Sequence, residues 1–93
     1  MPDAPARVVL FGREGCHLCE EARVVVADVC ARTGDTWREV DVDRPGDAAG
    51  GRDLAGELGE LVPVVEVDGV RQGYWRIDGG HLLRALSRPR PTP

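Results

Sequence analysis

Residues 11–22 of the chain read Phe-Gly-Arg-Glu-Gly-Cys-His-Leu-Cys-Glu-Glu-Ala, and within them two residues separate Cys16 from Cys19. This Cys-x-x-Cys pair follows a short apolar segment, residues 7–11, whose length and β-branched content predict a buried strand. After the pair, apolar residues recur at three- and four-residue steps as far as Gly34, which predicts an amphipathic helix. The pair is therefore expected where a strand passes into the first turn of a helix.

Two further elements are predicted in the middle of the chain. Apolar and polar residues alternate over residues 37–43, which predicts a second strand. Apolar residues at helical spacing within residues 47–59 predict a second helix, and it should be short or frayed because glycines interrupt it.

A β-hairpin and a final helix are predicted in the last third of the chain. Residues 62–67 and 70–73 are the strands of the hairpin, because Asp-Gly at residues 68–69 is the strongest kind of two-residue turn signal. Asp78 is expected to cap the last helix at its N-terminus, and Pro89 is expected to end it.

The predicted order is β-α-β-α-β-β-α, in one domain over residues 7–88 with flexible ends at residues 1–6 and 89–93. A right-handed helical crossover must join the first two strands, which therefore run parallel, whereas the hairpin adds antiparallel strands. The predicted class is α/β, with a mixed four-stranded sheet and helices on both faces. This arrangement resembles the thioredoxin fold.

The composition is that of an ordinary globular protein, and it excludes several kinds of partner. Hydrophobic residues make up 42% and charged residues 30% of the chain, whose formal net charge is -4. The chain lacks the basic surface that neutralises phosphates, so no nucleic acid is expected as a partner. No apolar run approaches the roughly 18 residues of a membrane span, and the start of the chain lacks the pattern of a secretory signal. We therefore expect no membrane partner and a cytoplasmic location.

The spacing of Cys16 and Cys19 suits reversible disulfide exchange. Side chains three residues apart on a helix have Cβ atoms about 5–6 Å apart, so a small rotation brings them within reach of a disulfide. Unpaired backbone N–H groups and the helix dipole favour a thiolate at Cys16, which is therefore the predicted nucleophile. Cys19, one turn deeper on the apolar side, is the predicted resolving thiol. Arg13 and His17 favour the thiolate if they are charged and close, whereas the neighbouring glutamates oppose it.

A Cys-x-x-Cys pair also fits half of a metal site or a redox-silent helix start. Zinc usually takes four ligands, and the other candidates are His17, His81 and Cys30. Cys30 is about 16 Å beyond Cys19 along the predicted helix, so it cannot join the same site, and we expect it to pack as a small apolar residue. No metal site within one chain is predicted. The alternatives to exchange are a metal or iron–sulfur cluster held between two chains and a redox-silent adaptor.

Taken together, residues 11–22, the Val62-Pro63 step and the Asp-Gly hairpin turn resemble the glutaredoxin-like family of small bacterial thioredoxin-fold proteins. The likeness covers residues 7–86 and implies a thiol–disulfide oxidoreductase. It also implies that the bond before Pro63 is cis, that this proline faces the cysteines, and that the backbone of Val62 pairs with the bound thiol substrate.

The resemblance is weaker for the residues that bind glutathione. Members that bind it share a Gly-Gly pair after the hairpin, an acidic residue near the last helix and a basic residue before the cysteines. Arg13 occupies the last of these places, but Tyr74 replaces the second glycine, and Gly79-Gly80 lies later, in the first turn of the final helix. This departure argues against glutathione dependence, and we expect no cofactor.

Tyr74 and Trp75 follow one another at the end of the fourth predicted strand. Alternation lets only one of them face the core, so the other is expected to form an aromatic wall beside the cysteines. The residues expected to contact the substrate are Arg13, His17, Val62, Pro63, Tyr74 and Trp75. The expected substrates are protein or low-molecular-weight disulfides, the expected reductant is the thioredoxin system or glutathione, and the protein is expected to be a monomer.

Overall fold

The computed structural model describes residues 6–89, and the ends predicted to be flexible lie outside these residues except for Ala6 and Pro89. The elements in chain order are β1 (Val8–Gly12), α1 (His17–Thr33), β2 (Trp37–Asp41), the 3₁₀ helix η1 (Gly46–Ala49), α2 (Leu54–Leu58), β3 (Val64–Val67), β4 (Val70–Tyr74) and α3 (Gly79–Leu86). None of the helices within the described residues is long and apolar enough to cross a membrane.

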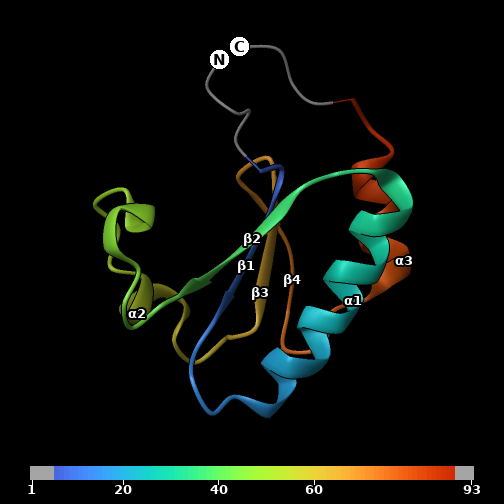
Figure 1. Ribbon diagram of the computed structural model, residues 1–93. Coiled ribbons are helices and arrows are strands. Elements are labelled where there is room, and N and C mark those ends of the chain that lie inside the picture. Colours follow the sequence, from blue (N-terminus) through green and yellow to red (C-terminus); the bar gives the residue numbers. More distant parts are fainter. Residues whose placement is uncertain (1–5, 90–93) are drawn as a thin grey trace.

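The four strands form one mixed sheet in the order β2-β1-β3-β4 (Figure 1). β1 pairs parallel with β2 and antiparallel with β3, and β4 pairs antiparallel with β3. α1 and α3 cover one face of the sheet, whereas η1 and α2 lie against the other. The predicted α/β arrangement with helices on both faces is confirmed.

The central strand β1 contributes to two apolar cores on opposite faces of the sheet. Val8 and Leu10 are fully buried against α1 and α3, whereas Val9 and Phe11 pack into the core on the α2 face. Successive side chains of a strand point to opposite faces, so a strand that is covered on both sides must be apolar throughout. This explains why β1 is a continuous apolar run.

The larger core lies between the sheet and the helices α1 and α3. Its buried residues outside β1 are Ala22, Val26, Val29, Cys30, Val65, Val67, Leu82 and Leu86. The two helices approach closely at Gly79, where an added Cβ would lie 3.3 Å from Cγ1 of Val25. The first glycine of the Gly-Gly pair therefore lets α3 pack against α1.

The smaller core is covered by two short helices rather than by one. Leu54 and Leu58 of α2 pack there against Phe11. Gly50 and Gly51 both have positive φ values, 58° and 86°, and they end η1 before α2 begins. The predicted helix over residues 47–59 is therefore interrupted by the glycines that were expected to fray it.

Local turn and cap signals are confirmed. Asp68 and Gly69 have φ values of 52° and 83°, the left-handed pair that a tight hairpin turn requires. Asp78 caps α3 by accepting a hydrogen bond from the backbone N–H of His81 at 3.2 Å. β3 begins two residues later than predicted, because the Val62 N–H donates to the Leu58 carbonyl at the end of α2 rather than to a strand.

Arg7, immediately before β1, ties the start of the sheet to three other segments. Its guanidinium donates to both carboxylate oxygens of Asp68, at 3.2 and 3.0 Å, and to the carbonyls of Leu86 and Arg88, at 3.3 and 2.9 Å. It also lies 3.6 Å from the Asp35 carboxylate, and its side chain is only 12% exposed. One residue therefore links the hairpin turn, the end of α3 and the loop after α1.

Replacing Arg7 by Met should lower the free energy of unfolding by about 1–3 kcal/mol, because it removes charge-assisted hydrogen bonds to partly buried groups. Urea denaturation followed by circular dichroism measures the change. Arg38→Met is the control, because Arg38 is exposed on β2 and forms no ion pair within residues 6–89. The control should change stability by less than about 0.5 kcal/mol. Equal effects of the two substitutions would contradict the assigned role of Arg7.

Candidate active site

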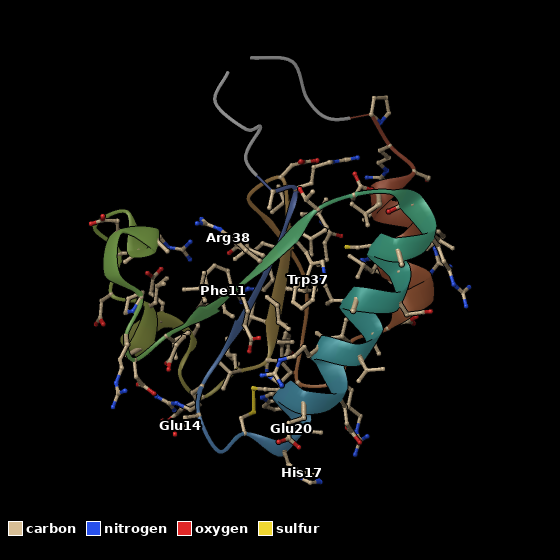
Figure 2. The ribbon with its side chains drawn as sticks, in the orientation of Figure 1. Phe11, Glu14, His17, Glu20, Trp37 and Arg38 are labelled. Atoms are coloured by element: carbon tan, nitrogen blue, oxygen red, sulfur yellow. A yellow bond between two sulfur atoms is a disulfide. The ribbon has the colours of Figure 1, made fainter. Side chains whose placement is uncertain are left out.

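Cys16 and Cys19 lie where β1 leads through residues 13–15 into α1. Figure 2 shows a disulfide as a yellow bond at this end of the sheet. Their side chains form a disulfide, and their Cα atoms are 5.2 Å apart. The connecting turn contains Gly15 with a φ of 77°, a conformation that glycine adopts without steric cost. The predicted placement of the pair between a strand and a helix is confirmed.

The two sulfur atoms lie in different environments. Cys16 is the half-buried N-cap residue of α1, and its Sγ accepts a hydrogen bond from the backbone N–H of Cys19 at 3.2 Å. Cys19 is 1% exposed. When the bond is reduced, the N–H groups and the dipole at the start of α1 favour negative charge on Cys16. The accessible sulfur is therefore also the one placed to hold charge.

Gly12, the last residue of β1, allows Cys19 to pack directly on the strand. The alternation of β1 directs position 12 toward α1, the same side as Val8 and Leu10. A Cβ on Gly12 would lie 3.2 Å from Sγ of Cys19. A side chain at position 12 would therefore crowd the disulfide.

The Val62–Pro63 peptide bond is cis, in agreement with the family resemblance. Pro63 is buried, and Val62 shares a hollow of about 450 Å³ with Leu18, which lies between the two cysteines in sequence. The Val62 N–H donates to the Leu58 carbonyl at 3.1 Å, whereas the Val62 carbonyl accepts no hydrogen bond within the part of the chain that the structure describes. The N–H of Val62 is thus bonded to the end of α2, whereas its carbonyl oxygen is available to accept a hydrogen bond.

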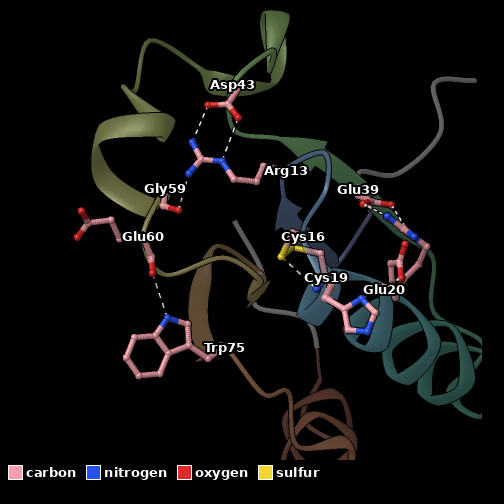
Figure 3. Close-up of a disulfide and its surroundings, with 11 residues drawn as sticks. Arg13, Cys16, Cys19, Glu20, Glu39, Asp43, Gly59, Glu60 and Trp75 are labelled. Carbon is pink, nitrogen blue, oxygen red and sulfur yellow. Dashed lines mark hydrogen bonds and ion pairs between the residues drawn. A yellow bond between two sulfur atoms is a disulfide. The ribbon is translucent and has the colours of Figure 1, made fainter.

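Arg13, three residues before Cys16, is held by groups that are distant in sequence. Its Nε and Nη2 donate to the two carboxylate oxygens of Asp43 at 3.0 and 2.7 Å, and its Nη1 donates to the Gly59 carbonyl at 2.9 Å (Figure 3). The two hydrogen bonds from Arg13 lower the pKa of Asp43 below its ordinary value. Arg13 therefore fastens the loop before the cysteines to the segment after β2 and to the end of α2. Its contact with substrate stays a prediction.

Tyr74 and Trp75 are 46% and 52% exposed, so neither faces the core. The prediction that one of the two residues faces the core is wrong. β4 ends at Tyr74, and Trp75 has a φ of 62°, which turns the chain out of the strand and ends the alternation. The two rings meet edge to face with centroids 5.2 Å apart, and both residues line the hollow that contains Leu18 and Val62. The expected aromatic wall therefore consists of both residues.

His17 points away from the protein at the start of α1. Its side chain is 93% exposed, and its Nδ1 lies 3.8 Å from the Glu20 carboxylate. Figure 2 shows it with Glu14 and Glu20 at the end of the molecule that carries the disulfide. The imidazole is accessible to a substrate, and its predicted role there stays a prediction.

Cys30 lies in the larger core and is 2% exposed. Burial raises the pKa of its thiol, and the Asp35 carboxylate raises it further. The expectation that Cys30 packs as a small apolar residue is confirmed. Within residues 6–89, no group of three or more His, Cys, Asp or Glu side chains is arranged to hold a metal ion.

Sequence reasoning missed the residues that position the site from a distance. These residues are Gly12, Asp43, Gly59 and Glu60. Each acts through a contact with a residue at least seven positions away along the chain, as Gly12 does with Cys19. Of these residues, only Gly12 gave a signal in the sequence, because a glycine directly after an apolar run indicates the end of a strand. That signal did not indicate that Cys19 packs closely against this position.

Comparisons with known protein sequences point to one family. The profile of the family described as Glutaredoxin-like domain matches residues 7–87. Uncharacterized proteins from Mycobacterium tuberculosis and Mycobacterium bovis are 34% identical over 79 residues, which cover 85% of this chain and 79% of each relative.

Solved structures show the same architecture. A protein from X. campestris has a TM-score of 0.65 and 26% identity, with 88% of this chain and 99% of that chain covered. A protein from Nitrosomonas europaea has a TM-score of 0.67 and 23% identity, with coverages of 91% and 95%. Buckwheat glutaredoxin, solved in complex with glutathione, has a TM-score of 0.54 and 22% identity, with coverages of 88% and 77%. The fold is thioredoxin-like, as the order of elements predicted.

Gly12→Ala should lower the free energy of unfolding of the oxidised protein by about 1–3 kcal/mol, because the added methyl group would lie only 3.2 Å from Sγ of Cys19 and the packed disulfide must shift to admit it. Gly73→Ala is a matched control, since a Cβ there would meet only Cδ1 of Ile77 at 3.9 Å, an ordinary contact. Thermal and urea denaturation of both variants measure the difference. If Gly12→Ala were as stable as the control, the close approach of Cys19 would not be a constraint on position 12.

Asp43→Asn should make the stability of the protein less sensitive to acid. Arg13 lowers the pKa of Asp43 in the folded state, so the pair stabilises the fold above the ordinary carboxyl pKa of about 4, and this contribution is lost as the pH falls through the lowered value. The melting temperature measured between about pH 5 and pH 2 should therefore fall less steeply in Asp43→Asn than in the unmodified protein.

The control for this measurement is Asp47→Asn, because Asp47 is exposed and forms no ion pair within the described residues. Asp78, whose pKa is lowered by backbone N–H groups at the start of α3, contributes in the same direction in every variant. Equal acid sensitivity of Asp43→Asn and Asp47→Asn would show that the bond between Arg13 and Asp43 does not stabilise the fold in solution.

Proposed function

The chain belongs to the glutaredoxin-like domain family, and from this premise we propose that it is a thiol–disulfide oxidoreductase whose active pair is Cys16 and Cys19. The observation that carries the proposal is their disulfide at the start of α1, in which one sulfur is half-exposed and the other is buried. This asymmetry suits an exchange in two steps. The half-exposed sulfur forms a mixed disulfide with the substrate, and the buried sulfur then attacks it and releases the substrate.

In the first step, the Cys16 thiolate attacks one sulfur of a substrate disulfide. A bond forms between Cys16 Sγ and that sulfur, the substrate disulfide breaks, and the other substrate sulfur leaves as a thiolate that takes a proton from water. The N–H of Cys19 and the dipole of α1 stabilise the attacking thiolate. The product is a mixed disulfide at the accessible cysteine.

In the second step, Cys19 loses its proton to water and attacks Cys16 Sγ. The bond between Cys16 and Cys19 forms, the mixed disulfide breaks, and the remaining substrate sulfur leaves as a thiolate that is then protonated. Two electrons have passed from the protein to the substrate. An external thiol reductant must then restore the dithiol before the next cycle.

The Val62 carbonyl is the backbone group that we assign to the substrate chain. Its N–H is already bonded to Leu58, so the substrate gains one backbone hydrogen bond here without displacing a bond of the protein. Pro63 follows it, and Tyr74 and Trp75 form the wall of the adjoining hollow. His17 lies fully accessible at the start of α1 for a second contact.

The proposed substrates are protein or low-molecular-weight disulfides in the cytoplasm, with the thioredoxin system or glutathione as reductant. A resident glutathione site of the kind that the resemblance describes is disfavoured, because Arg13 is engaged by Asp43 and Gly59 and because Tyr74 replaces a glycine. Glutathione therefore enters this proposal as one possible reductant and not as a cofactor.

Cys16→Ser should reduce disulfide-reducing activity to the level of the buffer, because it removes the attacking sulfur. Cys19→Ser should accumulate one mixed disulfide per chain at Cys16, because the resolving thiol is gone. Cys30→Ala should keep the activity, because Cys30 is buried in the core. Reduction of 2-hydroxyethyl disulfide and mass spectrometry of the trapped adducts measure these outcomes. Activity retained by Cys16→Ser and lost by Cys19→Ser would reverse the assigned roles.

A redox titration separates exchange from the alternative functions. The purified protein is equilibrated with glutathione buffers of graded potential, its free thiols are alkylated, and the modified cysteines are identified by mass spectrometry. Exchange requires a reversible two-electron transition between Cys16 and Cys19, with Cys30 free throughout. A pair that is blocked by metal in a coloured dimer would indicate a cluster carrier, and a pair that stays alkylatable throughout would indicate a redox-silent adaptor.

A further inference from the structure

We propose that an apolar groove beside the cysteines selects protein disulfides in which an apolar residue and a basic residue flank the reacting cysteine. This inference rests on the exchange function proposed above and names the substrate class. It is carried by the shape of the groove, by the way Trp75 is held in it, and by the charge around it.

The groove has a volume of about 430 Å³ and runs between α1 and the segment that follows β4. Leu18 and Val24 line it from α1, and Trp75 and Ile77 line it from the opposite side. Leu18 and Trp75 also line the hollow that contains Val62. The groove therefore shares lining residues with the place assigned to the substrate chain, and its volume is large enough for an apolar side chain.

Trp75 is held in a fixed position although half of its side chain is exposed. Its indole Nε1 donates to the Glu60 carbonyl at 3.0 Å, and its backbone N–H donates to the Pro63 carbonyl at 2.8 Å (Figure 3). Its φ of 62° is rare for a bulky residue and is a form of strain found at functional sites. A rigid, exposed aromatic ring gives a partner apolar contact at little cost in conformational entropy.

The rim of the site is acidic. Glu14, Glu21 and Glu60 are exposed and form no ion pair within residues 6–89. Glu20 lies 3.8 Å from the imidazole of His17 and also interacts electrostatically with Arg23. Figure 3 shows Glu20 and Glu60 in the surroundings of the disulfide. Arg76 on the groove wall offsets part of this charge.

Carboxylates thus outnumber the free cations near the cysteines, since the guanidinium groups of Arg13 and Arg23 are already paired with Asp43 and Glu39. A substrate with a basic residue beside its cysteine is attracted to this rim, and an acidic one is repelled. Glutathione disulfide is disfavoured for the same reason, because its carboxylates outnumber its amino groups. The groove therefore fits a basic and apolar peptide segment better than it fits an anionic tripeptide.

The test is a single-turnover reaction between the pre-reduced protein and symmetric disulfides of short, blocked peptides. The peptides differ only beside the cysteine, as Leu-Arg, Leu-Glu, Ser-Arg and Ser-Glu. The peptide with Leu and Arg should react about tenfold faster than the peptide with Ser and Glu. Its rate should fall as salt is added, whereas the rates of the Glu peptides should rise, because salt screens both attraction and repulsion.

Two variants separate the charge from the apolar contact. Glu21→Lys should shift the preference between Arg and Glu peptides toward Glu by about three- to tenfold. Asp28→Lys makes the same change of charge seven residues further along α1, about 10 Å from Glu21, and should shift the preference much less. Trp75→Asn, which tolerates the positive φ, should reduce the preference for Leu over Ser by about fivefold, whereas Val70→Asn at the exposed hairpin should not change it.

Reduction of the small, neutral 2-hydroxyethyl disulfide distinguishes a failure of the proposed exchange function from a failure of the proposed substrate class. Glu21→Lys, Asp28→Lys and Val70→Asn should reduce it at the rate of the unmodified protein, because it does not reach the charged rim. For Trp75→Asn, which alters the wall of the substrate hollow, only the ratio of the Leu and Ser peptide rates is compared. If the unmodified protein does not reduce it, the exchange function itself is wrong. If the protein reduces it but all four peptides react at equal rates with no salt dependence, the exchange function stands and the proposed substrate class is wrong.

Discussion

The burial of β1 on both faces is the constraint on which the rest of the structure depends. This strand pairs with β2 on one side and with β3 on the other, and its alternate side chains enter the two cores. A central strand of this kind needs cover above and below, and α1 with α3 and η1 with α2 provide it. At the end of the sheet opposite the cysteines, Arg7 joins the hairpin turn to the end of α3 by hydrogen bonds.

The position of the disulfide follows from the end of the same strand. β1 stops at Gly12, and the absence of a side chain there lets Cys19 pack on the strand while Cys16 remains at the start of α1. One cysteine is therefore buried by the sheet, and the other is kept at the surface by its place as the N-cap. The unequal roles proposed for the two thiols come from this difference in burial and not from the Cys-x-x-Cys spacing alone.

The two flanks of the disulfide are built differently. On one flank, Arg13 is hydrogen-bonded to Asp43 and Gly59, so this guanidinium stabilises the protein itself. On the other flank, Leu18 and Trp75 leave an open apolar surface. Together with the exposed carboxylates, this asymmetry is the basis on which we infer a protein substrate rather than a small anionic thiol.

Sequence alone determined those features whose physical causes are local. Side-chain alternation, helical spacing, the Asp68-Gly69 turn and the Asp78 cap depend on residues a few positions apart, so they predicted the order of elements and the place of the cysteines. The cis bond before Pro63 was implied only by family resemblance. Tertiary structure alone decided the pairing of Arg13 with Asp43, the packing of Cys19 on Gly12 and the exposure of Trp75. These features depend on contacts that form only when the sheet brings distant segments together. Residues that make such contacts are far apart in the sequence, so they produce no periodic pattern from which the contacts can be predicted.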